Sequence, residues 1–197
     1  AVVMVYPLLW MIGSSFKENN EIITSMSILP KQVRISAFVE GWKGNGRYTY
    51  LTYFTNTFLL VVPTVFFTVF SSMLVAYGFA RFRFPLKKLC FALVISTLLL
   101  PEQTLMVPRY LLFNRLGWLD SYKPMIVPAI FATYPFFIYM MIQFIRGLPR
   151  ELDESARIDG CGSFGIFARI IVPLSKPAIF SVTLFQFVWR WNDFFNP

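Results

Sequence analysis

The feature that most constrains the fold is a set of long stretches without charged side chains. Residues 48–80 and 124–145 contain no Asp, Glu, Lys or Arg, and residues 89–107 contain only Glu102. Crossing about 30 Å of hydrocarbon takes roughly 20 mostly apolar residues in a helix. We therefore expect three membrane-spanning helices here, and we interpret the apolar residues 1–13 and 179–191 as parts of two more.

The composition supports a membrane rather than an aqueous environment. Hydrophobic residues make up 56% of the chain and charged residues 14%, whereas soluble domains carry about 25% charged residues. One soluble core of this size could not cover so much apolar surface without leaving large exposed patches. The predicted fold class is all-α, a polytopic transmembrane helical bundle with about five spans.

Several classes of function are excluded by what the sequence lacks. The net charge is +8, yet no basic stripe with base-stacking aromatic residues occurs, so we expect no nucleic acid partner. The chain has no His, the commonest general acid or base, and its two Cys have no metal-ligand spacing. The Gly-rich residues 41–48 lack the Lys followed by Ser or Thr of a phosphate-binding loop. We therefore predict a non-enzyme with no catalytic residue, no metal and no nucleotide site of its own.

The basic residues predict an orientation. Residues 81–88 contain two Arg and two Lys without an acid, and short cytoplasmic loops carry an excess of Lys and Arg. We place residues 81–88 and 146–176 in the cytoplasm, and residues 13–50 and 109–123 outside.

Residues 146–176 form the most charged stretch of the chain and are expected to fold as two short helices. Pro149 suits the first helical position, and Gly160 suits a left-handed residue that closes the first helix. Ser163 is expected to cap a second helix over residues 164–170, which Pro173 would end.

The first of these helices has an acidic beginning. Glu151, Asp153 and Glu154 favour the positive N-terminal end of a helix. Leu152 and Ala156 are four residues apart and are expected to share one face.

The same stretch has Glu154, Ser155 and Ala156, then Gly160 six residues after Glu154, then Ile170 and the pair Val172-Pro173. This pattern resembles the EAA loop of ABC importer permeases. The family form has Ala at the position of Ser155 and usually Leu at that of Val172; the other positions match at the family's spacing. Outside the loop, residues 77–85, 107–121 and 187–197 are similar to carbohydrate-type permeases like the second permease of the maltose system. The loop residues to which the resemblance gives an ATPase-coupling role are Glu154, Ser155, Ala156, Asp159, Gly160, Ile170 and Pro173.

The resemblance implies a permease subunit of an ATP-driven importer for a sugar or oligosaccharide delivered by an extracytoplasmic solute-binding protein. The implied partners are a second permease subunit and two ATP-binding cassette subunits, which carry ATP-Mg, whereas this chain needs no cofactor. Residues 150–173 would couple it to the ATPase. The implied location is the cytoplasmic (inner) membrane of a prokaryote, in contact with lipid. We interpret residues 1–197 as a single transmembrane permease domain, truncated at both ends, from which a sixth span is missing.

A few polar residues near the ends of spans are candidates for the translocation path: Glu102, Gln103, Asn192 and Asp193. An ionisable residue within a span normally faces protein or water, but Glu102 also suits a helix-end residue that extends to the interface. Asn192 and Asp193 lie among aromatic residues that suit either sugar stacking or an interfacial aromatic belt with an Arg190–Asp193 ion pair.

An alternative function is an ion-coupled secondary transporter. Such a protein needs acids or His within the membrane and usually an internal repeat. Glu102 is the one candidate acid, and no convincing repeat is found. The sequence leaves open which sugar is carried.

Overall fold

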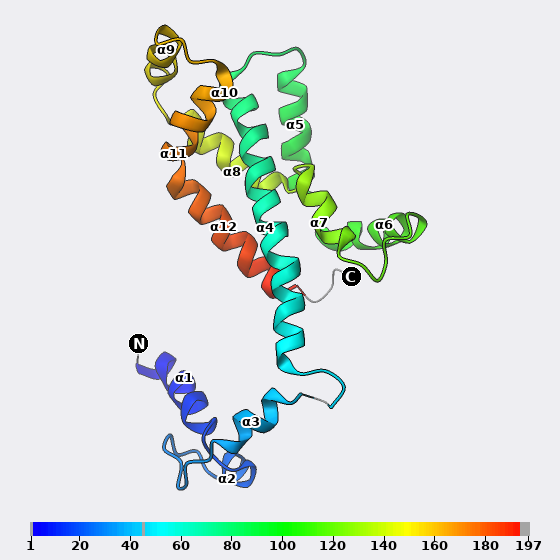
Figure 1. Ribbon diagram of the computed structural model, residues 1–197, viewed down its shortest axis with the longest axis vertical. Coiled ribbons are helices and arrows are strands. Elements are labelled where there is room, and N and C mark those ends of the chain that lie inside the picture. Colours follow the sequence, from blue (N-terminus) through cyan, green and yellow to red (C-terminus); the bar gives the residue numbers. More distant parts are fainter. Residues whose placement is uncertain (1, 45, 194–197) are drawn as a thin grey trace. The chain divides into compact units, whose positions relative to one another are not determined.

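The computed structural model describes residues 2–44 and 46–193, and within these residues all regular structure is helical. The chain divides into two compact units, residues 1–56 and residues 57–197. The helices of the first unit are α1 (Val2–Ser14), α2 (Asn19–Thr24) and α3 (Ser36–Trp42), followed by the start of α4 (Tyr50–Arg81). The second unit holds the rest of α4, α5 (Lys87–Leu98), α6 (Glu102–Arg115), α7 (Lys123–Ile130), α8 (Pro135–Arg146), α9 (Glu151–Ile158), α10 (Ser163–Ile166), the π-helix η1 (Phe167–Ile171), α11 (Val172–Leu174) and α12 (Lys176–Trp191) (Figure 1).

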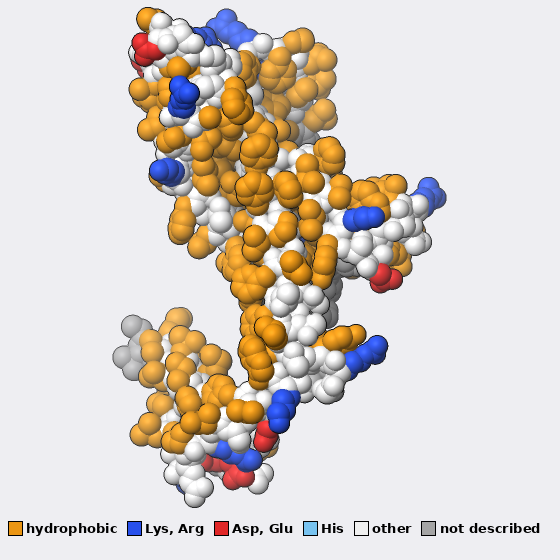
Figure 2. Space-filling model, viewed as in Figure 1, with side chains coloured by type: hydrophobic (Ala, Val, Ile, Leu, Met, Phe, Trp, Pro, Cys, Tyr) orange, Lys and Arg blue, Asp and Glu red, His pale blue; other side chains and the backbone are white. Residues whose placement is uncertain are grey.

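Helix α4 confirms the prediction of a long span. It has 32 residues and is both long enough and apolar enough to cross a membrane. Val61, Thr68 and Ser72 on one side are buried, whereas Phe66 and Phe70 on another are exposed. Hydrophobic side chains cover most of the face of the second unit seen in Figure 2, as expected of a surface in contact with lipid.

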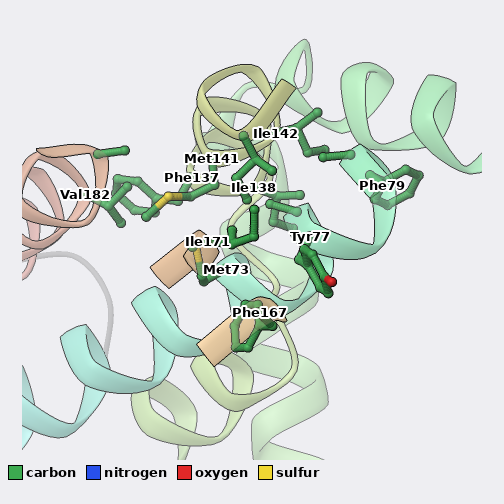
Figure 3. Packing of buried hydrophobic residues seen from close by; sticks show 14 of the residues in the cluster. Met73, Tyr77, Phe79, Phe137, Ile138, Met141, Ile142, Phe167, Ile171 and Val182 are labelled. Carbon is green, nitrogen blue, oxygen red and sulfur yellow. The ribbon is translucent and has the colours of Figure 1, made fainter. Parts of the chain in front are cut away.

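The hydrophobic core of the second unit lies around the C-terminal half of α4. Helix α8 presents Phe137, Met141 and Ile145 to it, spaced four residues apart on one face, and all three are fully buried. Ile171 of η1 and Val182 of α12 pack into the same cluster (Figure 3). The core therefore holds residues 146–176 against α4 and α8.

The predicted span over residues 89–107 is wrong as a continuous helix. Helix α5 ends at Leu98, α6 begins at Glu102, and the axes of the two segments differ by 104°. Pro101 lies at the break in an extended conformation. Proline disfavours a helical conformation in the residue before it and suits the start of a new helix.

The predicted span over residues 124–145 is present but interrupted. Helix α7 ends at Ile130 and Pro135 begins α8, so residues 131–134 form a turn between them. Taken together as Lys123–Arg146, the two helices are long and apolar enough to cross a membrane.

The described helices occupy the five places at which the sequence predicts spans. Two segments are long enough to cross a membrane, or four if each of two bent helix pairs counts as one span. The second bent pair is Ser163–Leu174 with Lys176–Trp191, and a shorter apolar helix, Met4–Ser14, lies at the place of the expected first span.

Candidate functional site

Residues 146–176 are called the charged loop below. Their first complete helix is α9, and Gly160 ends it as predicted. Gly160 has a φ of +80°. The N–H of Cys161 donates to the carbonyl of Ala156 at 2.8 Å, and the N–H of Gly160 donates to that of Arg157 at 3.0 Å. This pair of bonds is the Schellman motif, in which a glycine takes the left-handed position.

Three predictions within the charged loop are wrong in detail. Pro149 lies before α9, whose flanking residue is Arg150. Ser163 is the first residue of α10 and makes no capping hydrogen bond. Pro173 lies inside α11, and the chain bends by 73° only after Leu174. Pro173 follows η1 directly and removes a backbone hydrogen bond near the end of the continuous helical segment Ser163–Leu174.

The inner face of α9 combines an acidic and an apolar side chain. Asp153 and Ala156, three residues apart, are buried, whereas Leu152 is 40% exposed. The reason is Arg81 at the end of α4, whose Nε lies 2.8 Å from Oδ2 of Asp153. An opposite charge makes it feasible for a carboxylate to turn away from water, so a charged side chain lies beside Ala156 on the inner face of α9.

The predicted coupling residues divide into two groups. Ala156 is buried, and the partly buried Ile170 packs against the core, so these two hold the charged loop in place. The others are exposed to solvent: Glu154, Ser155, Asp159, Gly160 and Pro173.

Two residues of this site were missed by sequence reasoning. Tyr77 and Arg81 of α4 both contact the charged loop through side-chain hydrogen bonds to its backbone. Arg81 directly follows the uncharged residues 48–80. The first cation after a span, with acids in a later loop, was the available signal.

A cavity of about 950 Å³ lies between α5, α6, α8 and α12, and two of the four candidate path residues line it. Asn192 and Asp193 line this cavity, whereas Gln103 is exposed and does not. Glu102 begins α6, but its side chain lies outside the described part of the structure.

A cluster around Arg190 forms one wall of the cavity. Arg190 pairs with Asp193, as one of the two interpretations of this region expects, and donates a hydrogen bond to the hydroxyl of Tyr134. Trp189 packs against Phe137 with ring centroids 5.1 Å apart. The wall therefore joins aromatic rings to paired polar groups. This combination suits a translocation path and an interfacial aromatic belt alike.

Comparison with known proteins decides the family. Residues 32–196 match the family model described as the binding-protein-dependent transport system inner membrane component. This chain belongs to that family. The permease is 32% identical over 95% of its length to the putative ABC transporter permease protein ORF2 of Caldicellulosiruptor sp., and it covers 67% of that protein. It is 34% identical over 98% of its length to the galactooligosaccharides transport system permease protein GanQ of Bacillus subtilis, covering 68% of it.

A solved structure supports the fold of the permease. The crystal structure of a bacterial ABC transporter involved in the import of the acidic polysaccharide alginate matches with a TM-score of 0.85, at 23% identity. The match covers 97% of the permease and 66% of that chain. The permease spans about two thirds of the length of the curated relatives it matches.

These findings confirm the resemblance and the fold class predicted from the sequence. The permease is a membrane protein, and its exposed apolar faces are those of a helical bundle built for lipid. Membership of a binding-protein-dependent family favours the primary prediction over an ion-coupled secondary transporter.

Proposed function

We propose that this permease is a membrane subunit of an ATP-driven importer that takes up a sugar or oligosaccharide delivered by an extracytoplasmic binding protein. Similar proteins carry names that specify arabinooligosaccharides, galactooligosaccharides and diacetylchitobiose. Its partners in this proposal are a second permease, two ATP-binding subunits that hold ATP-Mg, and the binding protein. The assembly lies in the cytoplasmic (inner) membrane of a prokaryote.

The observation that carries the proposal is the two-sided character of α9. Asp153 and Ala156 fix its inner face to the core, and Glu154, Ser155 and Asp159 remain exposed. A short helix packed against the bundle can pass on a displacement that a flexible segment would absorb. Because α9 is packed against the bundle in this way, we assign the coupling role to it.

Apolar side chains beside these acids also favour a protein partner. Ile158 is 86% exposed and Phe164 76% exposed, on either side of the Gly160 turn. Burial of such side chains in an interface is favourable, and the acids between and before them would set the orientation through charge. In the proposal the ATP-binding subunit supplies the complementary apolar and basic surface.

The first prediction tests this surface with Glu154→Lys in the complete transporter. The exposed side chain should tolerate the change without loss of membrane insertion. Close interfacial charge pairs have coupling energies of about 1.5–7 kcal/mol, and the low end corresponds to about tenfold in association. We expect sugar uptake and substrate-stimulated ATP hydrolysis to fall by about tenfold or more, measured in membrane vesicles that contain matched amounts of permease.

The matched control is Glu40→Lys, which makes the same charge change on the exposed face of α3. This variant should transport like the unaltered protein. Normal uptake and normal ATP hydrolysis by Glu154→Lys would show that the charged loop is not the coupling element.

A further inference from the structure

The C-terminal end of α4 contacts the charged loop through three polar interactions. Arg81 Nε lies 2.8 Å from Asp153 Oδ2, and Arg81 Nη2 donates to the Leu148 carbonyl at 3.1 Å. One turn earlier on the same face of α4, the Tyr77 hydroxyl donates to the Ser163 carbonyl at 3.0 Å. These contacts lie before α9, on α9 and at the start of α10, so they span both helical parts of the charged loop.

The Arg81–Asp153 pair is removed from water. The Arg81 side chain is 4% exposed and that of Asp153 is 9% exposed. The hydrogen bonding of the pair is incomplete, because the Arg81 Nε–H is not aligned with the carboxylate and Asp153 Oδ1 has no hydrogen-bond partner among the described residues. In a buried pair of this kind the cost of desolvation offsets much of the attraction. Stabilisation of the fold therefore explains the presence of this pair poorly. The position that the pair gives to α9 explains it better.

Apolar packing surrounds the polar contacts. The ring centroids of Tyr77 and Phe167 are 5.1 Å apart, and Ala156 and Ile171 are buried in the same cluster as Met73 (Figure 3). Packed interiors have low compressibility and transmit displacement. A movement of α9 would therefore be passed to α4, the longest helix of the permease.

We propose that Arg81 and Tyr77 are positioning residues of the coupling step, which hold the charged loop so that displacement of α9 moves α4. The inference rests on the proposed function of the charged loop and extends it to the helix that receives the movement. The Arg81–Asp153 charge pair holds α9 itself, and the Tyr77 hydroxyl holds the start of α10.

The test uses the complete transporter reconstituted in proteoliposomes, with Asp153→Asn as the variant. This change keeps the shape of the side chain and removes its charge. Sugar uptake and ATP hydrolysis are measured in the same preparation, together with the amount of assembled complex. We expect uptake per ATP hydrolysed to fall by about tenfold, within the range by which residues along a coupling path modulate it, while assembly and hydrolysis persist.

Two further variants separate positioning from simple folding. Glu40→Gln neutralises an exposed acid on α3, outside the charged loop, and should leave uptake per ATP unchanged. Tyr77→Phe removes only the hydroxyl that donates to Ser163 and should also lower uptake per ATP. This variant keeps the inference testable where Asp153→Asn reduces assembly.

A double variant tests whether the charges act as a pair. Because residues in contact show non-additive effects, Arg81→Gln combined with Asp153→Asn should lose less than the product of the two single losses. The inference is overturned by losses that multiply, or by unchanged uptake per ATP in Asp153→Asn and Tyr77→Phe. It is also overturned if uptake and hydrolysis fall only in proportion to the assembled complex.

The result for Glu154→Lys distinguishes this inference from the proposed function. Loss of coupling in Glu154→Lys with normal coupling in Asp153→Asn contradicts only the role of the α4 contacts. Normal coupling in both variants contradicts the proposed function of the charged loop as well.

Discussion

At the scale of single residues, Gly160 fixes where α9 ends and where α10 can begin. Its φ of +80° lies in the left-handed region, and a Cβ built there would meet nothing within 4 Å. Steric contact with neighbouring elements is therefore excluded as the reason for glycine. The remaining reason is the backbone conformation, which costs residues with a Cβ about 1–2 kcal/mol.

Gly160→Ala is therefore expected to destabilise the charged loop by about 1–2 kcal/mol. The measurement is the midpoint of heat inactivation of the detergent-solubilised transporter, which should fall. Gly162→Ala is the matched control, because Gly162 has a φ of −72° and equally open surroundings. Equal midpoints for the two variants would contradict the role assigned to the left-handed turn.

The orientation of Asp153 shows where prediction from single residues stops. Gly160 could be predicted because a local backbone rule requires glycine at the end of a helix. Glu151, Asp153 and Glu154 are all acids in the first turn of α9, and no local rule selects the one that turns inward. The choice depends on Arg81, which is 72 positions earlier in the sequence and 2.8 Å away in the structure.

At the scale of helices, α4 was predictable and the breaks after it were less so. An uncharged stretch of this length has few stable conformations in a membrane other than a spanning helix. The prolines are harder to interpret, because Pro101 precedes a helix, Pro135 begins one and Pro173 lies inside one. Proline can stand just before a helix, in its first turn or near its end, so these positions indicate a boundary without showing how far the chain bends there.

The orientation of the helices gives a further prediction. Arg81 contacts the charged loop directly, so the basic residues 81–88 and the charged loop lie at the same end of the second unit. In a background that lacks Cys90 and Cys161, Ser163→Cys should react with an impermeant thiol reagent only after the membrane is opened. Glu40→Cys should react from outside in intact cells. Reaction of both cysteines from outside would reverse the predicted topology.

At the scale of the whole molecule, the second unit has the charged loop, the proposed site of a partner, at one end and a cavity formed by several helices elsewhere. Family membership could be predicted because the loop motif is continuous in the sequence. The cavity could not, because residues 93–109, 132–138 and 186–193 meet there only after the α5–α6 bend and the turn before α8 have formed. Asn192 and Asp193, two candidates for the translocation path, line this cavity, whereas Gln103, a third candidate, does not.

The most direct test of the account is the energy source of uptake by the complete transporter. The permease, its membrane partner and the ATP-binding subunits are reconstituted in proteoliposomes with external binding protein and labelled oligosaccharide, and ionophores collapse the proton and sodium gradients. The account predicts that uptake continues under these conditions with internal ATP, stops without ATP, and is absent from liposomes that contain the permease alone. Uptake that needs no ATP and stops when the ion gradients collapse would contradict it.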